Sequence, residues 1–342
     1  MSNRVIHVNL VIDEKFMLGA CVAAASVCVN AQPTTELVFH LFTENVRDES
    51  VEFFRKTIRR LHPNASVVQF VCTDETLKGL PRWGGSRMSA LRCSYAKLLP
   101  DVDVCVHLDA DILFLSSIED YVDFLREDVY VAASIEQDAL TAKRECDWIK
   151  RETGVNVRED QYFQAGMMVM NLKKIREDGL AGAFGPFFEA HPDVYSPDMD
   201  ALNALFCGCV AVVPKKWNLL QTILTDEELM QRPVIHYVSG APWSQKLWAV
   251  ANGRFRLWHA FADQYVWQKR GESYRRCFSR STLLGKILMY YLLRTPALGM
   301  AFAKVLEKLH RVVSAEGWVR TQVKCDVSNR AIKVALANKS IG

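Results

Sequence analysis

The amino-acid sequence predicts an α/β protein with a mainly parallel sheet, followed by a helical C-terminal extension. Short apolar runs alternate with helical patterns as far as Pro242, and strand signals fade beyond it. The 342 residues are 50% hydrophobic and 24% charged, which is typical of a globular chain with a large core and excludes wholesale disorder. We therefore predict an α/β domain over residues 1–250 and a basic helical region over 251–342.

Each predicted element follows from a local pattern. Apolar runs of five to eight residues predict strands at Val5–Ile12, Leu37–Phe42, Val67–Cys72, Val104–Leu108, Val129–Ser134, Gly166–Asn171, Cys209–Val213 and Val234–Val238. Periodic apolar positions predict helices at Met17–Asn30, Glu49–Leu61, Met88–Leu99, Ser117–Arg126 and Asp198–Phe206. The first helix is rich in small residues and can pack closely on a sheet, and Pro100 ends the third.

The N-terminus and the cysteines predict a cytoplasmic protein. Arg4 leads directly into the first apolar run, without the apolar region and cleavage site of a signal peptide. The ten cysteines are scattered, and the close pair Cys207 and Cys209 has the wrong spacing for a zinc ribbon. We expect reduced, mostly buried thiols.

Motifs that bind phosphate through a glycine-rich loop are missing. Asp13-Glu14-Lys15-Phe16 follows the first strand in place of a G-x-G-x-x-G turn, and Trp83-Gly84-Gly85-Ser86 matches neither this motif nor a P-loop. Dinucleotide oxidoreductases and P-loop enzymes are therefore disfavoured. A bound pyrophosphate would have to be neutralised in another way.

A metal ion is the alternative, and the sequence offers ligands for it. Asp109-Ala110-Asp111 comes directly after the buried strand Val104–Leu108, at the strand end where open α/β sheets bind ligands. Carboxylate oxygens suit Mn²⁺ or Mg²⁺. The D-x-D pattern is also common in exposed turns, but the apolar runs on both sides favour a metal site, because two buried carboxylates need a cation.

Four further residues are candidates, and three of them have a structural alternative. His236 in Val234–Val238 is either a buried core histidine or a third metal ligand. Gly166 opens a strand and permits close approach of a ligand. Asp198 and Asp200 either act at a site or cap a helix, and capping is the better interpretation for Asp200.

Together these residues resemble glycosyltransferase family 8, the retaining transferases that include lipopolysaccharide glucosyl- and galactosyltransferases and glycogenin. Four blocks match in order over about residues 5–245: the first strand with its acidic turn, Tyr95-Ala96-Lys97 with the D-x-D strand, Phe163–Leu172 with Asp198–Leu205, and His236–Trp243. The resemblance implies a GT-A-type fold, in which a Rossmann-like mixed sheet is sandwiched by helices. It also implies a UDP-glucose or UDP-galactose donor.

The resemblance assigns roles to residues of this chain. Mn²⁺ or Mg²⁺ would be held by Asp109, Asp111 and His236. The donor would be bound by Val11, Ile12, Asp13, Phe16, Ala110, Met199 and Gly240, with Phe16 stacking on uracil. Lys97, Gln164 and Asp198 would act on the donor sugar or the diphosphate as catalytic residues.

The chain also departs from the family pattern. Met199 replaces a glutamine beneath the anomeric carbon, Gln164 replaces an asparagine, and Ala241 replaces a lysine on the diphosphate. We expect a divergent but active hexosyltransferase that delivers its sugar to a cell-surface glycan such as lipopolysaccharide core. The alternatives are a catalytically weak relative that binds glycan or UDP-sugar, and an unrelated nucleotide-binding or scaffold protein.

Charge is unevenly distributed along the chain. Residues 1–268 carry 27 Lys/Arg and 35 Asp/Glu, and residues 269–342 carry 15 and 4, so the net charges are −8 and +11. The helical pattern Ser281–Val313 has Leu and Tyr at helical spacing, which suits an anionic membrane surface or packing on the catalytic domain. The family resemblance favours peripheral attachment to the cytoplasmic face of the inner membrane. No nucleic-acid-binding motif accompanies the basic charge, and the oligomeric state is open.

Overall fold

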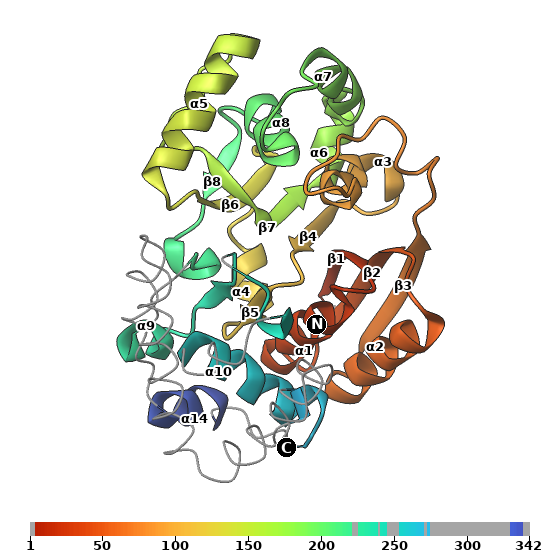
Figure 1. Ribbon diagram of the computed structural model, residues 1–342, viewed down its shortest axis with the longest axis vertical. Coiled ribbons are helices and arrows are strands. Elements are labelled where there is room, and N and C mark those ends of the chain that lie inside the picture. The colour runs from red at the N-terminus through yellow and green to blue at the C-terminus, as the bar shows by residue number, and fades with distance from the viewer. Residues whose placement is uncertain are drawn as a thin grey trace, which may run out of the picture.

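A computed structural model describes residues 4–220, 225–238, 240–244, 253–269, 272–273 and 329–337 of the protein (Figure 1). Its main sheet has seven strands in the order β3-β2-β1-β4-β7-β6-β8. Their bounds are β1 Val5–Asp13, β2 Glu36–Glu44, β3 Ala65–Val71, β4 Val104–Leu108, β6 Val131–Ile135, β7 Phe163–Asn171 and β8 Val210–Val212.

The main sheet is mostly parallel, as predicted. Strand β7 runs antiparallel to both of its neighbours, while the other pairs are parallel. A second, two-stranded sheet pairs β5 (Ile112–Phe114) with β9 (Val234–His236) in antiparallel fashion. Because β7 runs against the others, its first residues lie at the edge where the parallel strands end.

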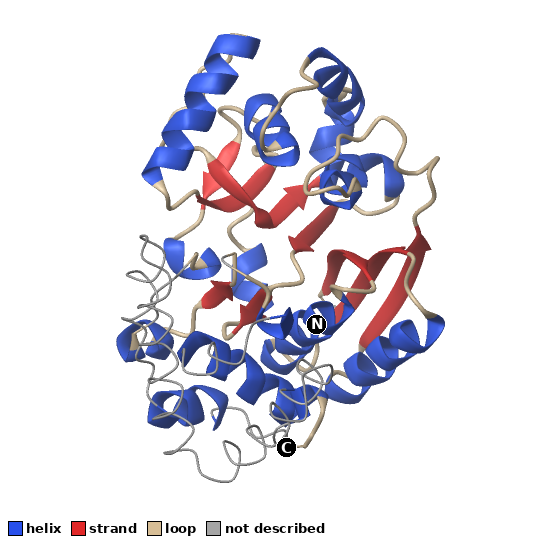
Figure 2. Cartoon of the chain, viewed as in Figure 1, coloured by secondary structure: helices blue, strands red, loops and turns tan. Residues whose placement is uncertain are grey.

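Helices cover both faces of the main sheet (Figure 2). On one face lie α1 (Met17–Asn30), α2 (Asp48–Leu61), α4 (Ile118–Val122), α9 (Asp226–Met230), α10 (Gly253–Phe261) and α14 (Asn329–Ala337). On the other lie α3 (Tyr95–Leu98), α5 (Ala139–Thr153), α6 (Leu172–Glu177), α7 (Phe184–Ala190) and α8 (Pro197–Leu205). Short tight helices complete the chain: η1 Met88–Ser94, η2 Leu180–Gly182, η3 Lys215–Asn218, η4 Pro242–Ser244 and the π-helix η6 Ala262–Val266.

Simple sequence patterns explain the helices that pack closest to the sheet. Helix α1 is buried along nearly its whole length because its small side chains leave room for neighbours. Gly19 shows how close they come, since a Cβ there would lie 2.3 Å from the Trp243 ring and 2.7 Å from the Ala110 carbonyl oxygen. Helix α2 buries Val51, Phe54, Ile58 and Leu61, which recur at three- and four-residue spacing.

Some sequence predictions were wrong in detail. Met88–Leu99 is a tight η1 turn followed by the four-residue α3, because the Arg92 side chain turns inward and its Nε donates to the Ser89 carbonyl. Ser117–Arg126 shortens to α4. Helix α5 was missed because its apolar stripe, Ala142, Cys146 and Ile149, is narrow among charged residues.

The described C-terminal residues pack on the α/β domain. Trp258, Tyr265 and Leu336 are buried in the same core as α1, and the Tyr265 hydroxyl donates to the Leu336 carbonyl at 3.0 Å. The predicted helix Ser281–Val313 lies outside the described residues. Nowhere in the described part is there a helix both long and apolar enough to cross a bilayer.

Candidate active site

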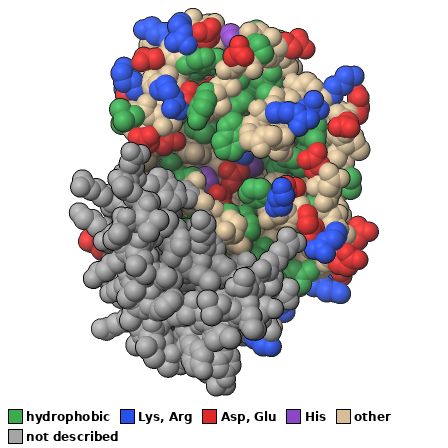
Figure 3. All heavy atoms as spheres, viewed as in Figure 1, with side chains coloured by type: hydrophobic (Ala, Val, Ile, Leu, Met, Phe, Trp, Pro, Cys, Tyr) green, Lys and Arg blue, Asp and Glu red, His purple; other side chains and the backbone are tan. Residues whose placement is uncertain are grey.

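Three predicted ligands meet beyond the carboxyl end of β4. The D-x-D segment links β4 to β5, and the register of β5 and β9 places Ile112 opposite His236. One ligand atom from each of Asp109, Asp111 and His236 lies within 4.8 Å of the others. His236 Nε2 is 3.2 Å from Asp111 Oδ1 and 3.8 Å from Asp109 Oδ2. In Figure 3, acidic and histidine side chains lie together in a hollow near the middle of the face shown.

The two oxygens of Asp109 have separate surroundings. Oδ1 accepts from Arg92 Nη2 at 2.8 Å and from His107 Nε2 at 3.0 Å, whereas Oδ2 faces His236. Burial alone would raise the pKa of Asp109, but Arg92 and His107 outweigh it and hold that pKa well below its usual range. Asp109 is therefore an anion that keeps one oxygen available for a cation.

Behind this carboxylate lies a short hydrogen-bonded chain. Burial and the positive charge of Arg92 lower the pKa of His107 to about 4, so this imidazole is neutral. Its Nε2–H donates to Asp109, and its Nδ1 accepts from the Tyr95 hydroxyl at 2.9 Å. The chain fixes the orientation of Asp109 from the core side.

His236 is held in the tautomer that a metal requires. Its Nδ1 donates to Asn218 Oδ1 at 3.0 Å, so the neutral imidazole directs the lone pair of Nε2 at the space between the two aspartates. Burial by itself would lower the pKa of His236, but Asp111 and Asp109 raise it above the ordinary value. The two carboxylates therefore favour a positive charge at His236 Nε2, which either a proton or a metal ion can supply.

The glycine at the start of β7 has no room for a side chain. A Cβ on Gly166 would lie 2.3 Å from His236 Cε1 and 2.6 Å from Asp109 Oδ2. The Gly166 carbonyl accepts from the Asp109 backbone N–H at 2.8 Å, and the Gly166 N–H donates to Gln164 Oε1. Hard oxygen ligands, an imidazole nitrogen and a glycine that clears the space between them fit a divalent cation such as Mn²⁺ or Mg²⁺.

The residues expected to bind the donor lie at the same edge. Asp13 Oδ1 accepts from the backbone N–H groups of Lys15 and Phe16, which closes the turn after β1. Phe16 is 44% exposed, and its ring meets Trp243 edge-on at 5.8 Å. Val11 is half-buried, and Gly240 follows β9 with a φ of 135°. The Ile12 side chain is buried in the core, so only its backbone can face a ligand.

Arg92 connects Asp198, on helix α8, to the candidate metal ligand Asp109. The buried Arg92 Nε lies 3.2 Å from Asp198 Oδ2, and its Nη1 donates to the Ala165 carbonyl. Burial raises the pKa of Asp198 despite this ion pair. Met199 is half-buried beside it.

Asp200 is a structural residue of the same helix. Its carboxyl accepts from the Tyr162 hydroxyl at 2.7 Å and from the Ser196 backbone N–H at 3.2 Å, so it ties the start of α8 to the residue that precedes β7. Burial raises its pKa to about 7. This agrees with the capping interpretation of Asp200.

Sequence patterns did not predict two residues of the site, Arg92 and Asn218. Lys97, the expected cation, lies exposed on α3, whereas Arg92 bridges Asp109 and Asp198. An arginine within an apolar run, between Leu91 and Cys93, was the available signal. Asn218 follows Trp217 in a segment for which the sequence predicts no helix or strand. It can bond to His236 because the neighbouring Leu219 forms backbone hydrogen bonds with β9.

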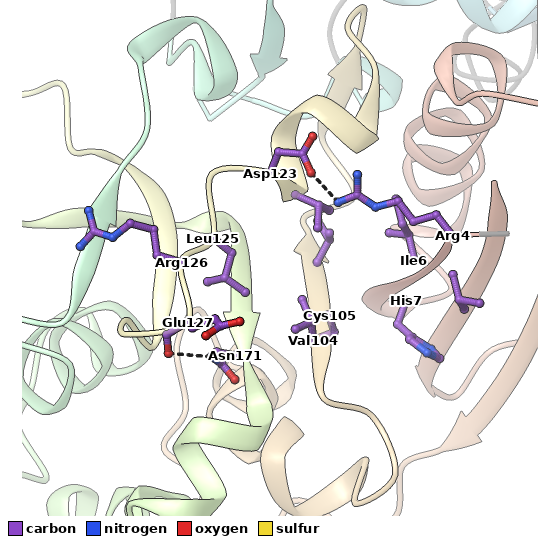
Figure 4. Close-up of a pocket in the computed structure, with 13 residues that line it drawn as sticks. Arg4, Ile6, His7, Val104, Cys105, Asp123, Leu125, Arg126, Glu127 and Asn171 are labelled. Carbon is purple, nitrogen blue, oxygen red and sulfur yellow. Dashed lines mark hydrogen bonds and ion pairs between the residues drawn. The ribbon is translucent and has the colours of Figure 1, made fainter. Parts of the chain in front are cut away.

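A separate cavity of about 340 Å³ lies at the opposite edge of the sheet (Figure 4). The amino-terminal halves of β1 and β4 line it, together with the end of β7 at Asn171. An ion pair of 2.7 Å between Arg4 and Asp123 lies at its rim. It has no part in the metal cluster.

Comparisons with known proteins find relatives of this chain among the glycosyltransferases. The chain is 26% identical over 235 residues to a lipopolysaccharide 1,2-glucosyltransferase from Escherichia coli, covering 65% of each chain. The match thus spans just under two thirds of that relative. It is 27% identical over 251 residues to a lipopolysaccharide 1,3-galactosyltransferase from Salmonella typhimurium, covering 68% of this chain and 71% of the relative.

The fold has close counterparts among solved structures. The galactosyltransferase LgtC, solved with donor and acceptor sugar analogs, superposes with a TM-score of 0.62 at 23% identity, covering 76% of this chain and 96% of LgtC. This likeness establishes the GT-A-type fold. The model of glycosyl transferase family 8 matches residues 7–247, which include the aspartates, the histidine and Arg92. The chain therefore belongs to glycosyl transferase family 8.

Proposed function

We propose that the protein is a metal-dependent retaining hexosyltransferase that moves glucose or galactose from a UDP-sugar to a glycan such as lipopolysaccharide core. The observation that carries this proposal is the cluster of Asp109, Asp111 and His236 at the strand edge. Family membership and the names of the relatives support the UDP-sugar donor and the lipopolysaccharide acceptor.

The residues around the cluster have complementary roles in this proposal. Asp109 Oδ2, Asp111 and His236 Nε2 would hold Mn²⁺ or Mg²⁺, which supplies positive charge to the leaving diphosphate. Phe16 and Asp13 would receive the uridine, with Val11, Ile12, Ala110 and Gly240 lining the donor site. Arg92 stays bonded to both Asp109 and Asp198, so it links the metal side of the site to the sugar side.

Retention of configuration would follow from attack on the face from which the diphosphate leaves. Met199 provides neither a carbonyl oxygen nor a nucleophile, and Asp198 is already paired with Arg92. Asp198 would orient hydroxyl groups of the donor or acceptor, and Gln164 would contact the donor sugar through its amide NH₂ group. The acceptor proton would pass to the leaving phosphate oxygen. Lys97, exposed on α3, would act on the donor sugar or the diphosphate from that side of the site.

A UDP-release assay tests the proposal. UDP-glucose and UDP-galactose are supplied separately, with Mn²⁺, with Mg²⁺ and with excess EDTA, in the presence of a lipopolysaccharide acceptor. Release that requires the metal supports the proposal, and full activity in EDTA refutes the metal assignment. Binding of UDP-sugar without turnover would support the second candidate, a weak binding relative, which Met199 and Ala241 favour.

We also propose that the basic region 251–342 attaches the enzyme to the cytoplasmic face of an anionic membrane. The net charge of +11 in residues 269–342 supports this location. The packing of α10 and α14 on the α/β domain means that attachment would use the residues between them.

A further inference from the structure

The loop between β3 and η1 presents a tryptophan on a tight turn. Trp83 and Ser86 exchange backbone hydrogen bonds of 2.8 and 3.0 Å, and the two glycines between them have φ values of 57° and 88°. Two positive φ values at the centre of a two-residue turn give a tight hairpin that only residues such as glycine accept readily. Arg82 Nη1 also donates to the Gly85 carbonyl at 2.8 Å. The Trp83 side chain nevertheless remains 57% exposed.

This turn lies on the catalytic edge of the sheet. The loop leaves the carboxyl end of β3 and runs to η1, which leads directly into α3. Figure 1 shows the chain passing from β3 to the region of α3. The backbone N–H of Met88 donates to Ser86 Oγ at 3.1 Å, which joins the turn to η1. A tight helix rises about 2 Å per residue, so Arg92 lies about 8 Å along η1 from Met88. The same short unit therefore carries the exposed ring and the arginine that contacts Asp109 and Asp198.

The loop is cationic within an acidic body. Residues 78–92 contain four Lys/Arg and no Asp/Glu, whereas residues 1–268 carry a net charge of −8. Lys78 pairs with Glu75 and Arg92 with the site aspartates. Among the described residues, Arg82 and Arg87 have no acidic partner, and Arg87 Nε and Ser89 Oγ are buried without a hydrogen bond. The loop therefore keeps cationic side chains and hydrogen-bond donors that acidic groups of the described residues do not neutralise.

We propose that Trp83, Arg82 and Arg87 form an acceptor subsite for an anionic oligosaccharide. This inference rests on the proposed transferase function and names the acceptor class. An indole ring offers a flat apolar surface for the C–H face of a sugar, and guanidinium groups bind phosphate or carboxylate groups in a bidentate manner. A phosphorylated sugar unit can bind both the tryptophan, through its C–H face, and the arginines, through its phosphate. A neutral glycan can bind only the tryptophan.

Binding experiments with a defined probe test this subsite. The probe is core oligosaccharide from rough-type lipopolysaccharide, deacylated to remove membrane-binding chains, and compared before and after removal of its phosphates. Titration calorimetry measures its Kd for the full-length protein and for Trp83→Ala and Arg82→Ala/Arg87→Ala. The control Arg151→Ala/Arg158→Ala removes the same charge from exposed arginines that pair with Glu152 and Asp160. UDP binding in Mn²⁺ is measured for every variant.

We expect both test variants to weaken binding of the phosphorylated probe tenfold or more, with unchanged UDP binding and an unaffected control. The double arginine variant should bind the dephosphorylated probe as the parent does. Failure of the parent protein to bind the phosphorylated probe overturns the subsite, as do variants that bind it unchanged. A tenfold loss of UDP affinity in Trp83→Ala also overturns it, because the ring would then serve the donor nucleobase.

The outcome separates this inference from the proposed function. Metal-dependent turnover of UDP-sugar by the parent, together with unchanged acceptor affinity in the variants, would refute the subsite alone. Absence of turnover with every donor would refute the proposed function itself.

Discussion

Gly166→Ala is the sharpest test of the metal cluster, because it changes the site without removing a ligand. The added methyl would lie 2.3 Å from His236 Cε1, and ordinary contact begins near 3.4 Å, so one of the two groups must move by about 1.1 Å. Asp109 Oδ2, at 2.6 Å, must also withdraw. Both atoms are fixed from behind, by Asn218 and by Arg92 with His107, so neither relaxes freely.

The expected loss follows from this displacement. Misplacing a catalytic group by 1 Å costs about 100-fold in rate, and disturbing the support of a metal ligand costs about 10–100-fold in metal affinity. We expect Mn²⁺-dependent UDP binding to weaken by about 10–100-fold and UDP-sugar turnover to fall by about 100-fold. Overpacking should lower the free energy of unfolding by about 1–3 kcal/mol, which leaves the protein folded.

Calorimetry with Mn²⁺ and UDP, the UDP-release assay and chemical denaturation measure these three quantities. Gly182→Ala and Gly185→Ala are matched controls, because a Cβ at either position meets no atom within 4 Å. Gly166→Ala protein that binds Mn²⁺ and turns over donor within about threefold of the parent would refute the arrangement of the cluster.

Other predictions concern single residues. Asp111→Ala and Asp109→Ala should both abolish Mn²⁺-dependent UDP binding in calorimetry. Denaturation of Asp109→Ala should also show a free energy of unfolding lower by about 3–5 kcal/mol, because the buried Arg92 guanidinium loses a partner. Equal stability of the two variants would contradict this. Met199→Gln should preserve or raise UDP release, because it restores a carbonyl oxygen near the developing positive charge, and a tenfold drop would argue that Met199 suits another sugar pose. Burial raises the pKa of Asp200 from 3.8 to about 7, so the folded protein keeps a proton that the unfolded chain loses, and the free energy of unfolding should fall as pH rises from about 4 to about 7. Asp200→Asn should flatten this pH dependence in denaturation curves, and an unchanged slope would exclude Asp200 as its source. Reversing the charges of Arg275, Arg276 and Arg280 in the basic region should weaken sedimentation with anionic vesicles at least tenfold, at about 1 kcal/mol per charge. UDP binding should stay intact. Unchanged sedimentation would refute membrane attachment through these three arginines.

Local patterns were sufficient for most of the fold. An apolar run that ends in Asp109-Ala110-Asp111 predicts both a buried strand and acidic groups at its carboxyl end, because strand direction alone decides where those groups lie. Alternation of strands and helices likewise predicts a sandwich. The strand bounds shifted by only a few residues, as Val129–Ser134 became β6, since strand ends depend on the hydrogen bonds of neighbouring strands.

The sequence by itself identified Asp109, Asp111 and His236 as candidate metal ligands, and the tertiary structure decided what surrounds them. Asp109 and Asp111 share a local motif, but Arg92 reaches Asp109 from η1 only because the inward turn of that segment forms against the sheet. The hydrogen bond between Asn218 and His236 joins residues that are far apart in the sequence, so no local pattern predicts it. The antiparallel direction of β7, which places Gly166 between the ligands, is also a long-range result. Local propensity specifies which residues follow a strand, whereas packing of distant segments specifies which side chains meet there.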